Sequence, residues 1–475
     1  MSYTDLLKNK ISGKRCAILG LGVSNTPLLR LLLSLGTAEE ITVYDEKPSV
    51  EQSPDAIGFA AQGVRFVTGE RCFEDLRADI IFRSPGIRPD GRAIQRELER
   101  GAVLTSEIEE LLELSPAKSF AVTGSDGKTT TTTLCGKFLS SAFRVFVGGN
   151  IGTPLLDRLD GMSEKDALVL ELSSFQLMRV SRAPDAVAIT NISQNHLDWH
   201  TDEAEYISAK KNIIGNSTRR AVLNADCEIT AKIAAEICLE RPDIELFMFS
   251  SKKHSYDEVC AEAKGAKAIF IRDGEVILSD REKEERLLCC SDIRLPGVHN
   301  IENYMTAMAL CYGYADKAIF ASVAREFGGV EHRLEFVRRL DGVDYYNSSI
   351  DSSPSRTAAA LSALAGRDIT LIAGGYDKKL DYSPLAKSIA AFGVKTVVLT
   401  GATAEKIHAA LLDCPEASEV KIFRAERFEQ ALLCARANAA VGGCVLLSPA
   451  SASFDQFKNF SERGQRFKEL VLELK

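Results

Sequence analysis

The segment from Thr123 to Thr130 has the residue types of a phosphate-binding loop. It follows an apolar run and reads Thr-Gly-Ser-Asp-Gly-Lys-Thr-Thr. Its two glycines allow the tight turn that directs backbone N–H groups at phosphate oxygens, and the helix that follows adds partial positive charge at its N-terminus. The sequence therefore predicts that ATP binds here, through Gly124, Ser125, Asp126, Gly127, Lys128, Thr129 and Thr130.

Lys128 and Thr129 are the residues of this loop that we expect to act most directly on the nucleotide. In such loops the lysine reaches the β- and γ-phosphates and the hydroxyl binds Mg²⁺. Two positions depart from the usual pattern, because Val122 stands where the full motif has a glycine and Asp126 places a carboxylate beside a polyanion. The alternative, a glycine turn at the start of a helix, leaves the register of the lysine and threonine unexplained.

Candidate metal ligands follow downstream. Glu171 is embedded in an apolar strand, where a carboxylate is costly unless it is paired or metal-bound; the alternative is a strand edge in solvent. His196 lies just past another strand, and His200 is expected to be a structural hydrogen-bonding residue. Lys210 and Lys211 lie on one predicted helix, and their spacing alone is typical of a solvated face.

A second glycine motif lies near the N-terminus. Gly20-Leu21-Gly22 follows a short strand, and Asp45 ends the next strand. A dinucleotide fingerprint would have a third glycine where Asn25 stands. Asp45 suits a ribose hydroxyl of either NAD or a UDP compound, and a turn without any ligand is the remaining interpretation.

The surrounding pattern alternates strands and helices along the whole chain, which predicts an α/β fold with three domains, each built on a sheet. We place them at residues 1–117, 118–329 and 330–475. A helix is expected from Ser24, a candidate N-cap, to Leu35, with Gly36 just past its end. Further helices are expected at 91–100, 203–214 and 301–312, and a hairpin around Asp273-Gly274.

Composition narrows the class of protein. The chain has 475 residues, 45% of them hydrophobic, and a formal net charge of -8. This acidic balance argues against general nucleic-acid binding, and the apolar stretches are too short for a membrane-spanning helix. The N-terminus lacks the apolar segment of a signal peptide, and the 12 cysteines form no CxxC pair. We therefore expect a cytoplasmic protein with no nucleic-acid or membrane partner and with reduced cysteines. We also expect a monomer, which composition does not determine.

Seven segments in order resemble the Mur ligases of peptidoglycan synthesis, over essentially the whole chain. They are Thr123–Thr130, Gly148–Gly152, Leu170–Leu177, Asn195–Asp198 with Tyr206–Lys210, Pro296–Asn303, Glu331–Glu335 and Leu447–Phe457. The last segment is most similar to that of the members that add D-glutamate. The resemblance implies an N-terminal Rossmann-like UDP-binding domain, a central ATPase domain of the P-loop type and a C-terminal Rossmann-like domain.

The resemblance also implies the activity and the site residues. It implies a ligase that uses ATP and two Mg²⁺ ions to join D-glutamate to UDP-N-acetylmuramoyl-L-alanine, with Lys210 carbamylated by CO₂. The implied catalytic residues are Lys128, Lys210 and His196, and the implied metal ligands are Thr129 and Glu171 for one ion and His196 and Lys210 for the other. The implied contacts are Asn300, Asn303 and Arg333 for ATP, Gly22, Val23, Ser24, Asp45 and Asn150 for the UDP-substrate, and Lys406, Ser453 and Phe460 for D-glutamate.

Three positions depart from the family pattern, and three rival functions stay open. Ser348 stands where a carboxylate is common, with Asp351 as a candidate replacement; Tyr376 displaces the acidic residue of a Gly-Gly-Asp motif to Asp377; and Asp126 replaces an asparagine. The rivals are another ligase of the superfamily, such as one acting on a different amino acid or on folate, an NAD-dependent oxidoreductase, and a nucleotide-binding protein without catalytic activity.

Overall fold

The computed structural model describes residues 3–193 and 199–475 and contains three α/β sheets. The first two sheets lie in one compact unit, Met1–Asp292 with Val298–Val323, which we call the larger unit. The third sheet lies in the smaller unit, Ile293–Gly297 with Ala324–Lys475. Each sheet falls inside one of the three domains that we expect from the sequence, whose boundaries stay a prediction.

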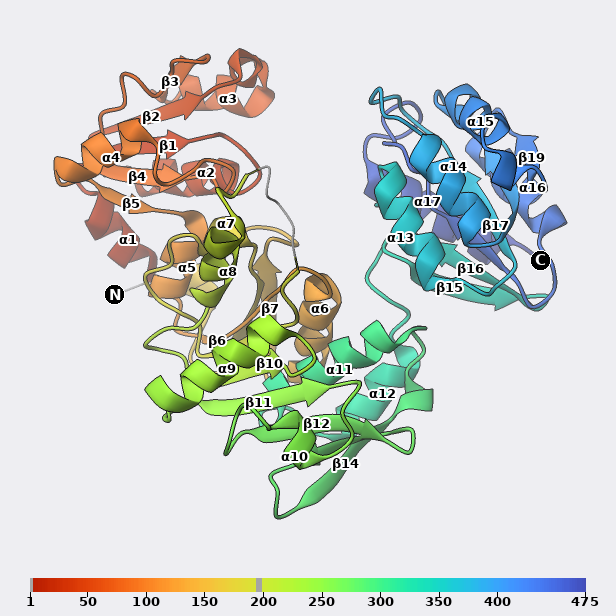
Figure 1. Ribbon diagram of the computed structural model, residues 1–475. Coiled ribbons are helices and arrows are strands. Elements are labelled where there is room, and N and C mark those ends of the chain that lie inside the picture. Colours follow the sequence, from red (N-terminus) through yellow and green to blue (C-terminus); the bar gives the residue numbers. More distant parts are fainter. Residues whose placement is uncertain (1–2, 194–198) are drawn as a thin grey trace. The chain divides into compact units, whose positions relative to one another are not determined.

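The first sheet has the order β3-β2-β1-β4-β5, and all of its strands are parallel (Figure 1). Gly36 ends helix α2 in a left-handed conformation, as expected, whereas Ser24 precedes the helix without making a side-chain capping bond. The elements here are α1 (Tyr3–Ile11), β1 (Arg15–Leu19), α2 (Asn25–Leu35), β2 (Glu40–Asp45), η1 (Pro48–Gln52), α3 (Pro54–Ala60), β3 (Arg65–Thr68), β4 (Ile80–Arg83), α4 (Arg92–Glu99), β5 (Val103–Thr105) and α5 (Glu107–Leu114).

The central sheet has nine strands in the order β14-β13-β12-β11-β10-β9-β6-β8-β7. Strands β12 to β14 pair antiparallel, and the other strands pair parallel. Its elements are β6 (Lys118–Thr123), α6 (Lys128–Leu139), β7 (Arg144–Gly149), η2 (Leu156–Gly161), β8 (Asp166–Glu171), α7 (Ser174–Leu177), β9 (Ala186–Ile189), α8 (Glu203–Lys211), β10 (Arg220–Asn224), α9 (Glu228–Glu240), β11 (Glu245–Ser250), α10 (Tyr256–Val259), β12 (Lys267–Arg272), β13 (Glu275–Ser279), β14 (Glu284–Cys289), η3 (Cys290–Asp292), α11 (Val298–Cys311) and α12 (Ala318–Glu326).

Strand β6 pairs in parallel with both β8 and β9, so the carboxyl ends of these three strands meet. In open α/β sheets a ligand binds beyond such strand ends, where the strand order reverses. The phosphate loop, Glu171 and the segment after β9 are therefore brought to one edge of the sheet.

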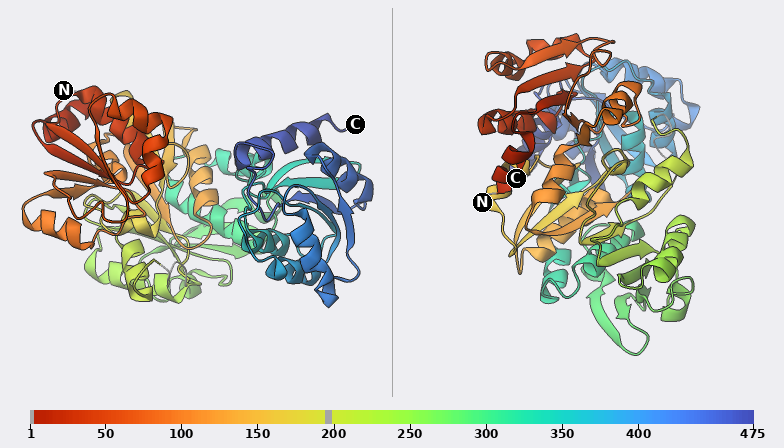
Figure 2. Two further views of the ribbon diagram at one scale, coloured as in Figure 1. Left: turned by 90° about the horizontal axis from the view of Figure 1, so that it is seen from above. Right: turned by 90° about the vertical axis from the view of Figure 1, so that its left-hand side faces the viewer.

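The third sheet has the order β15-β16-β20-β17-β18-β19, with only the β15-β16 pair antiparallel. Helices cover both faces of it (Figure 2), because one buried cluster packs beside α13 to α15 and another beside α16 and α17. The elements are β15 (Glu335–Leu340), β16 (Val343–Asn347), α13 (Pro354–Ala363), β17 (Ile369–Ala373), α14 (Ser383–Ala391), β18 (Val394–Leu399), α15 (Ala404–Leu412), η4 (Pro415–Ala417), β19 (Lys421–Arg424), α16 (Phe428–Asn438), β20 (Cys444–Leu447) and α17 (Phe460–Glu473).

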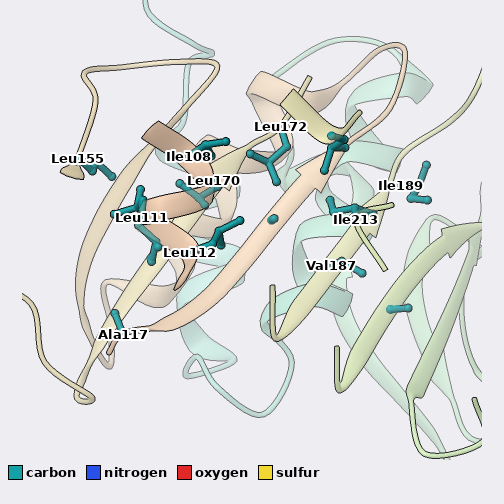
Figure 3. Close-up of a cluster of buried hydrophobic side chains, with 14 of the residues drawn as sticks. Ile108, Leu111, Leu112, Ala117, Leu155, Leu170, Leu172, Val187, Ile189 and Ile213 are labelled. Carbon is teal, nitrogen blue, oxygen red and sulfur yellow. The ribbon is translucent and has the colours of Figure 1, made fainter. Parts of the chain in front are cut away.

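One continuous apolar core joins the first sheet to the central sheet within the larger unit. Figure 3 shows Ile108, Leu111 and Leu112 of α5 beside Leu170 and Leu172 at the end of β8. Removing this much apolar surface from water favours a fixed contact between α5 and the central sheet. In the part of the chain that is described, no helix is long and apolar enough to cross a membrane.

Candidate active site

The phosphate loop connects β6 to α6, and its two glycines adopt positive φ angles that other residues rarely adopt. Gly124 has a φ of +148° and Gly127 a φ of +79°. A Cβ on Gly124 would lie 1.9 Å from the Thr190 hydroxyl, and one on Gly127 would lie 2.3 Å from Oδ1 of Asn303. Conformation and close packing therefore both require glycine at these two positions.

Two lysines converge on one carbonyl oxygen of this loop. Lys128 donates to the Gly124 oxygen at 3.0 Å and to the Ser125 oxygen at 2.9 Å. Lys210, from helix α8, donates to the same Gly124 oxygen at 2.6 Å. Two amines separated by 82 positions in the chain (128 to 210) are thus held beside the loop that would carry the phosphates.

The environment of Lys210 contradicts the solvated-face interpretation. Its side chain is buried, 2% exposed, and its ammonium lies 4.7 Å from the centre of the Tyr206 ring. Burial, reinforced by the nearby charge of Lys128, lowers the pKa of Lys210 to about 7. Its neighbour Lys211 is exposed and forms an ion pair with Glu236. The two lysines therefore differ in chemistry, which the sequence alone does not reveal.

Glu171 is also buried, and one of its oxygens lacks a partner among the described residues. Asn150 donates from Nδ2 to Oε1 of Glu171 at 2.8 Å, and its own N–H donates to the Glu171 carbonyl oxygen at 2.7 Å. Oε2 of Glu171 has no hydrogen bond with any described residue. A buried carboxylate oxygen without a donor is costly, and it suits a bound cation. The solvent-exposed alternative for Glu171 is wrong.

Residues after β9 hold the phosphate loop in place, and sequence reasoning did not single them out. Ser125 donates its N–H to the Asn191 oxygen at 2.9 Å, and Asp126 donates its N–H to Oδ1 of Asn191 at 3.0 Å. The Ser125 hydroxyl bonds to the Ser193 oxygen and to the Tyr206 hydroxyl. A polar segment directly after a strand that flanks β6 was the only available signal.

Two predicted nucleotide contacts, Asn300 and Asn303, lie on helix α11 next to the loop. The helix begins at Val298, three residues before the expected start, so both asparagines fall in its first two turns. Asn303 accepts from the Thr131 hydroxyl at 3.3 Å and donates to Oδ1 of Asn300 at 3.3 Å. Both side chains are buried, which places their amides against α6.

A cavity of about 340 Å³ opens at the carboxyl ends of β1 and β2. Gly20, Gly22, Asp45 and Lys47 line it, together with Ser84 and Ile87 from the turn after β4. The Asp45 carboxylate accepts from the backbone N–H groups of Leu21 and Lys47, each at 2.9 Å. Of the other residues predicted for this site, Val23 is 80% exposed, and neither it nor Ser24 lines the cavity. Asn150 donates to Glu171, and its predicted contact with the UDP-substrate stays a prediction.

The residues predicted for D-glutamate lie in the smaller unit. Ser453 is buried, Phe460 is 38% exposed, and Lys406 forms an ion pair with Asp377 at 2.5 Å. The buried Arg463 donates to the carbonyl oxygens of Ser451 and Ala452 at 3.1 and 3.0 Å, so it holds the backbone that leads into Ser453.

Asp351, the candidate replacement for the carboxylate that Ser348 lacks, lies in the same unit. Asp351 is buried, its N–H donates to the Ser348 oxygen at 3.0 Å, and its carboxylate accepts from the Ser448 hydroxyl at 2.7 Å. Burial raises the pKa of the Asp351 carboxyl to about 6. Arg333, the predicted nucleotide contact, is exposed in the same unit.

The remaining predicted ligand, His196, lies outside the described residues. Within residues 3–193 and 199–475, no three histidine, cysteine, aspartate or glutamate side chains gather closely enough to hold a metal ion. The described candidates for a cation are therefore the free oxygen of Glu171, the Thr129 hydroxyl and Lys210, if that lysine carries a carboxylate.

The phosphate loop lies where the strand order of the central sheet reverses, and the buried Glu171 lies at the end of the neighbouring strand. Together these two features define an ATP-dependent α/β enzyme. The sequence matches the Mur ligase middle domain over residues 122–311 and the Mur ligase, glutamate ligase domain over residues 332–451. The chain belongs to the Mur ligase family.

Two relatives within the family are similar to this chain over almost its full length. The chain is 43% identical over 472 residues to the UDP-N-acetylmuramoylalanine–D-glutamate ligase of Acetivibrio thermocellus, covering 98% of this chain and 97% of the relative. It is equally identical over 480 residues, 43%, to the enzyme of the same name from Ruminiclostridium cellulolyticum, covering 99% of each.

Solved structures support the fold. UDP-N-acetylmuramate-alanine ligase from Thermotoga maritima superposes with a TM-score of 0.54 at 19% identity, covering 97% of this chain and all of that one. A UDP-N-acetylmuramoyl-L-alanyl-D-glutamate–2,6-diaminopimelate ligase gives 0.56 at 17% identity, covering 92% and 93%.

Proposed function

We propose that the protein joins D-glutamate to the alanyl carboxylate of UDP-N-acetylmuramoyl-L-alanine, with conversion of ATP to ADP and phosphate, in the synthesis of peptidoglycan precursors. Full-length relatives that carry the name of this ligase at 43% identity support the substrates. The single structural observation that carries the ATP-dependent chemistry is the pair Lys128 and Lys210 on the Gly124 oxygen, beside the buried Glu171.

The reaction needs ATP because a carboxylate is a poor acyl donor. Attack of the alanyl carboxylate oxygen on the γ-phosphorus forms an acyl phosphate and releases ADP. The D-glutamate amine then adds to the acyl carbon. The tetrahedral intermediate expels phosphate, and the nitrogen loses one proton as the amide forms. The enzyme must therefore stabilise anionic charge first on the transferring phosphoryl group and then on the leaving phosphate.

The chain supplies groups suited to this task. Lys128 would leave the Gly124 and Ser125 carbonyls to meet the β- and γ-phosphates, and the loop N–H groups would bind their oxygens. The unpartnered oxygen of Glu171 fits a Mg²⁺ ion, which Thr129 would share. When bound, Mg²⁺ neutralises phosphate charge and orients the γ-phosphoryl group. Asn150 fixes the Glu171 carboxylate in the required direction.

Lys210 is proposed to carry a carbamate. The amine with a pKa of about 7 is largely neutral in mildly alkaline solution. A neutral amine can attack CO₂, which forms an N–C bond and releases one proton. The product is an anionic group beside the phosphate loop, and together with His196 it would serve a second Mg²⁺ ion.

The two substrates are proposed to bind in separate parts of the chain. The cavity beside Asp45 suits the uridine of the UDP-substrate. The Ser453 to Phe460 segment suits D-glutamate, with Lys406 as the cationic contributor, and Arg333 is kept as a contact for ATP. This assignment corresponds to the proposed domains 1–117, 118–329 and 330–475. Since ATP and a UDP-linked sugar are the reactants, we place the enzyme in the cytoplasm. We further propose that it is a monomer.

The test is ADP release from purified protein with ATP, Mg²⁺ and UDP-N-acetylmuramoyl-L-alanine, plus D-glutamate, L-glutamate, L-lysine or no amino acid. We expect release only with D-glutamate. Release with another amino acid would keep the ligase chemistry and overturn the substrate, and no release with any of them from protein that binds ATP would overturn the activity.

The variant Lys128→Ala tests the proposed role of this lysine in the same assay. Loss of the ammonium should lower kcat by at least about 100-fold, because it removes charge stabilisation from the phosphoryl transfer. Lys232→Ala is the matched control, since Lys232 is an exposed lysine paired with Glu228 on α9. Near-normal turnover in Lys128→Ala would exclude the proposed role.

A further inference from the structure

A network of hydrogen bonds, half-buried at Arg88 and fully buried at His200, connects the turn after β4 to helices α7 and α8. Arg88 donates to both carboxylate oxygens of Glu205, at 3.1 and 2.7 Å, and to the Trp199 carbonyl oxygen at 2.8 Å. Trp199 in turn donates from its indole N–H to the Gly86 oxygen at 3.1 Å. The turn thus contacts the N-terminal part of α8 and the residue just before His200.

His200 continues this network into the central sheet. Its Nδ1 lies 3.0 Å from Oε2 of Glu205, and its Nε2 lies 2.9 Å from the Ser174 hydroxyl. The His200 side chain has no exposed surface. Because Glu205 can only accept, Nδ1–H donates to it, and the neutral ring then accepts the Ser174 hydroxyl at Nε2. Burial lowers the pKa of His200, which agrees with a neutral ring.

Aromatic packing holds the imidazole in that orientation. The centre of its ring lies 4.8 Å from that of Trp199, 5.6 Å from that of Phe175 and 5.3 Å from that of Tyr206. Tyr206 also bonds to Ser125 of the phosphate loop at 2.9 Å. The histidine is therefore enclosed on several sides and has one arrangement that satisfies both of its nitrogens.

The two partners of His200 lie close in sequence to the groups that the reaction needs. Ser174 is the first residue of α7 and follows Glu171 by three positions. Glu205 lies in the first turn of α8, the helix that carries Lys210. One imidazole thus bridges helix α7, which follows β8, and helix α8.

We propose that His200 is a positioning residue of the ligase, which fixes Glu171 and Lys210 relative to each other, with Arg88 and Glu205 fixing His200 in turn. The proposal rests on the proposed function. His200 itself touches neither nucleotide nor substrate, because its ring is enclosed by the side chains named above. Groups that hydrogen-bond directly to metal ligands typically change metal affinity or activity 10- to 100-fold when removed. His200 acts one step further out, through Ser174 and Glu205.

The experiment compares His200→Ala and His200→Gln with the matched control His254→Ala, whose histidine is exposed and lies before α10. We expect His200→Ala to lower kcat about 10- to 100-fold and to raise the Mg²⁺ concentration for half-maximal rate, with the KM for the UDP-substrate within about 3-fold. His200→Gln, which can still reach Ser174, should recover part of the loss. Far-UV circular dichroism should show unfolding midpoints close to that of His254→Ala.

A second measurement separates failure of this proposal from failure of the proposed function. Calorimetric titration with ATP at low and high Mg²⁺ requires no amino-acid substrate, and His200→Ala should weaken ATP binding more at low Mg²⁺ than at high. Equal Mg²⁺ dependence in variant and wild type, or loss of kcat only in proportion to unfolded protein, would overturn the positioning role. If His200→Ala does not fold, Ser174→Ala deletes only the last hydroxyl of the network. This variant should lower kcat about 3- to 10-fold and should show the same change in Mg²⁺ dependence.

Discussion

At the scale of single residues, the central feature of the candidate site is the Gly124 carbonyl oxygen, which two lysines contact. The Gly124 oxygen accepts from both Lys128 and Lys210. Burial disfavours the charged form of Lys210, and repulsion from the neighbouring Lys128 adds to this effect. Lys210 is therefore the lysine of the pair whose charged form burial disfavours, which agrees with the proposed carbamate.

Lys210 and Lys211 offer a matched pair of variants. Lys210→Ala should lower kcat by at least about 100-fold, because a proposed metal ligand is lost, and a short carboxylic acid should partly restore the rate. Lys211→Ala should stay within about 3-fold of wild type, since only an exposed ion pair is removed. Initial rates of ADP release measure both. A fully active Lys210→Ala would exclude the carbamate.

The pKa of Lys210 also predicts a pH dependence. Because this pKa is lowered, the amine is protonated below about pH 7 and neutral above it. Stimulation by added bicarbonate in CO₂-depleted buffer should therefore increase as the pH rises through about 7. Lys211→Ala should keep this stimulation. Stimulation that falls over the same range, or none at any pH, would contradict the assignment.

At the scale of elements, the phosphate loop has a shape that only glycine allows at position 127. Gly127→Ala would add strain at a φ of +79° and a collision with Oδ1 of Asn303. We expect ATP affinity to fall about 10-fold or more, measured by calorimetry. Gly58→Ala is the control, because Gly58 lies in helix α3 with open space around it. Unchanged affinity in Gly127→Ala would show that the loop adapts.

Helix α17 carries two arginines, one buried and one partly exposed, that provide a test variant and a matched control in the smaller unit. Arg463 is buried and holds the backbone that leads into Ser453, whereas Arg466 is partly exposed and pairs with Glu429. Arg463→Lys loses several of these bonds and should raise the KM for D-glutamate about 10-fold without changing ATP affinity. Arg466→Lys should change neither. A change in ATP affinity alone would argue against the proposed D-glutamate site.

At the scale of the whole molecule, the chain forms two compact units, each with its own apolar core. Its single tryptophan, Trp199, belongs to the larger unit. Unfolding in urea followed by tryptophan fluorescence should therefore report the larger unit, while far-UV circular dichroism reports both, and the two transitions should not coincide.

Ligands provide the internal control for that experiment. ATP with Mg²⁺ at about 100 times Kd should stabilise the larger unit by about 2.7 kcal/mol and move the fluorescence transition to higher urea. Coincident transitions by both probes, with and without nucleotide, would show instead that the chain unfolds as one cooperative body.

Much of the fold could be predicted because its signals are local. The hairpin expected around Asp273-Gly274 is observed between β12 and β13, and the glycine after α2 adopts the left-handed conformation that ends the helix. Short or partly exposed elements were not predicted, such as β3 and β5, because a strand of three or four residues carries too little periodicity. The phosphate loop was recognisable from sequence because its glycines, lysine and threonine are consecutive.

The sequence by itself determined the class of chemistry: a nucleotide loop, an acidic residue in an apolar strand and the order of motifs. Only the tertiary structure decided which lysine is buried, that Asn150 holds Glu171, and that Arg88, Glu205, His200 and Ser174 form one network. The physical reason is that loop conformation depends on neighbouring residues, whereas burial, pKa and hydrogen-bond partners depend on elements that are far apart in the chain and meet only when the sheet and its helices pack.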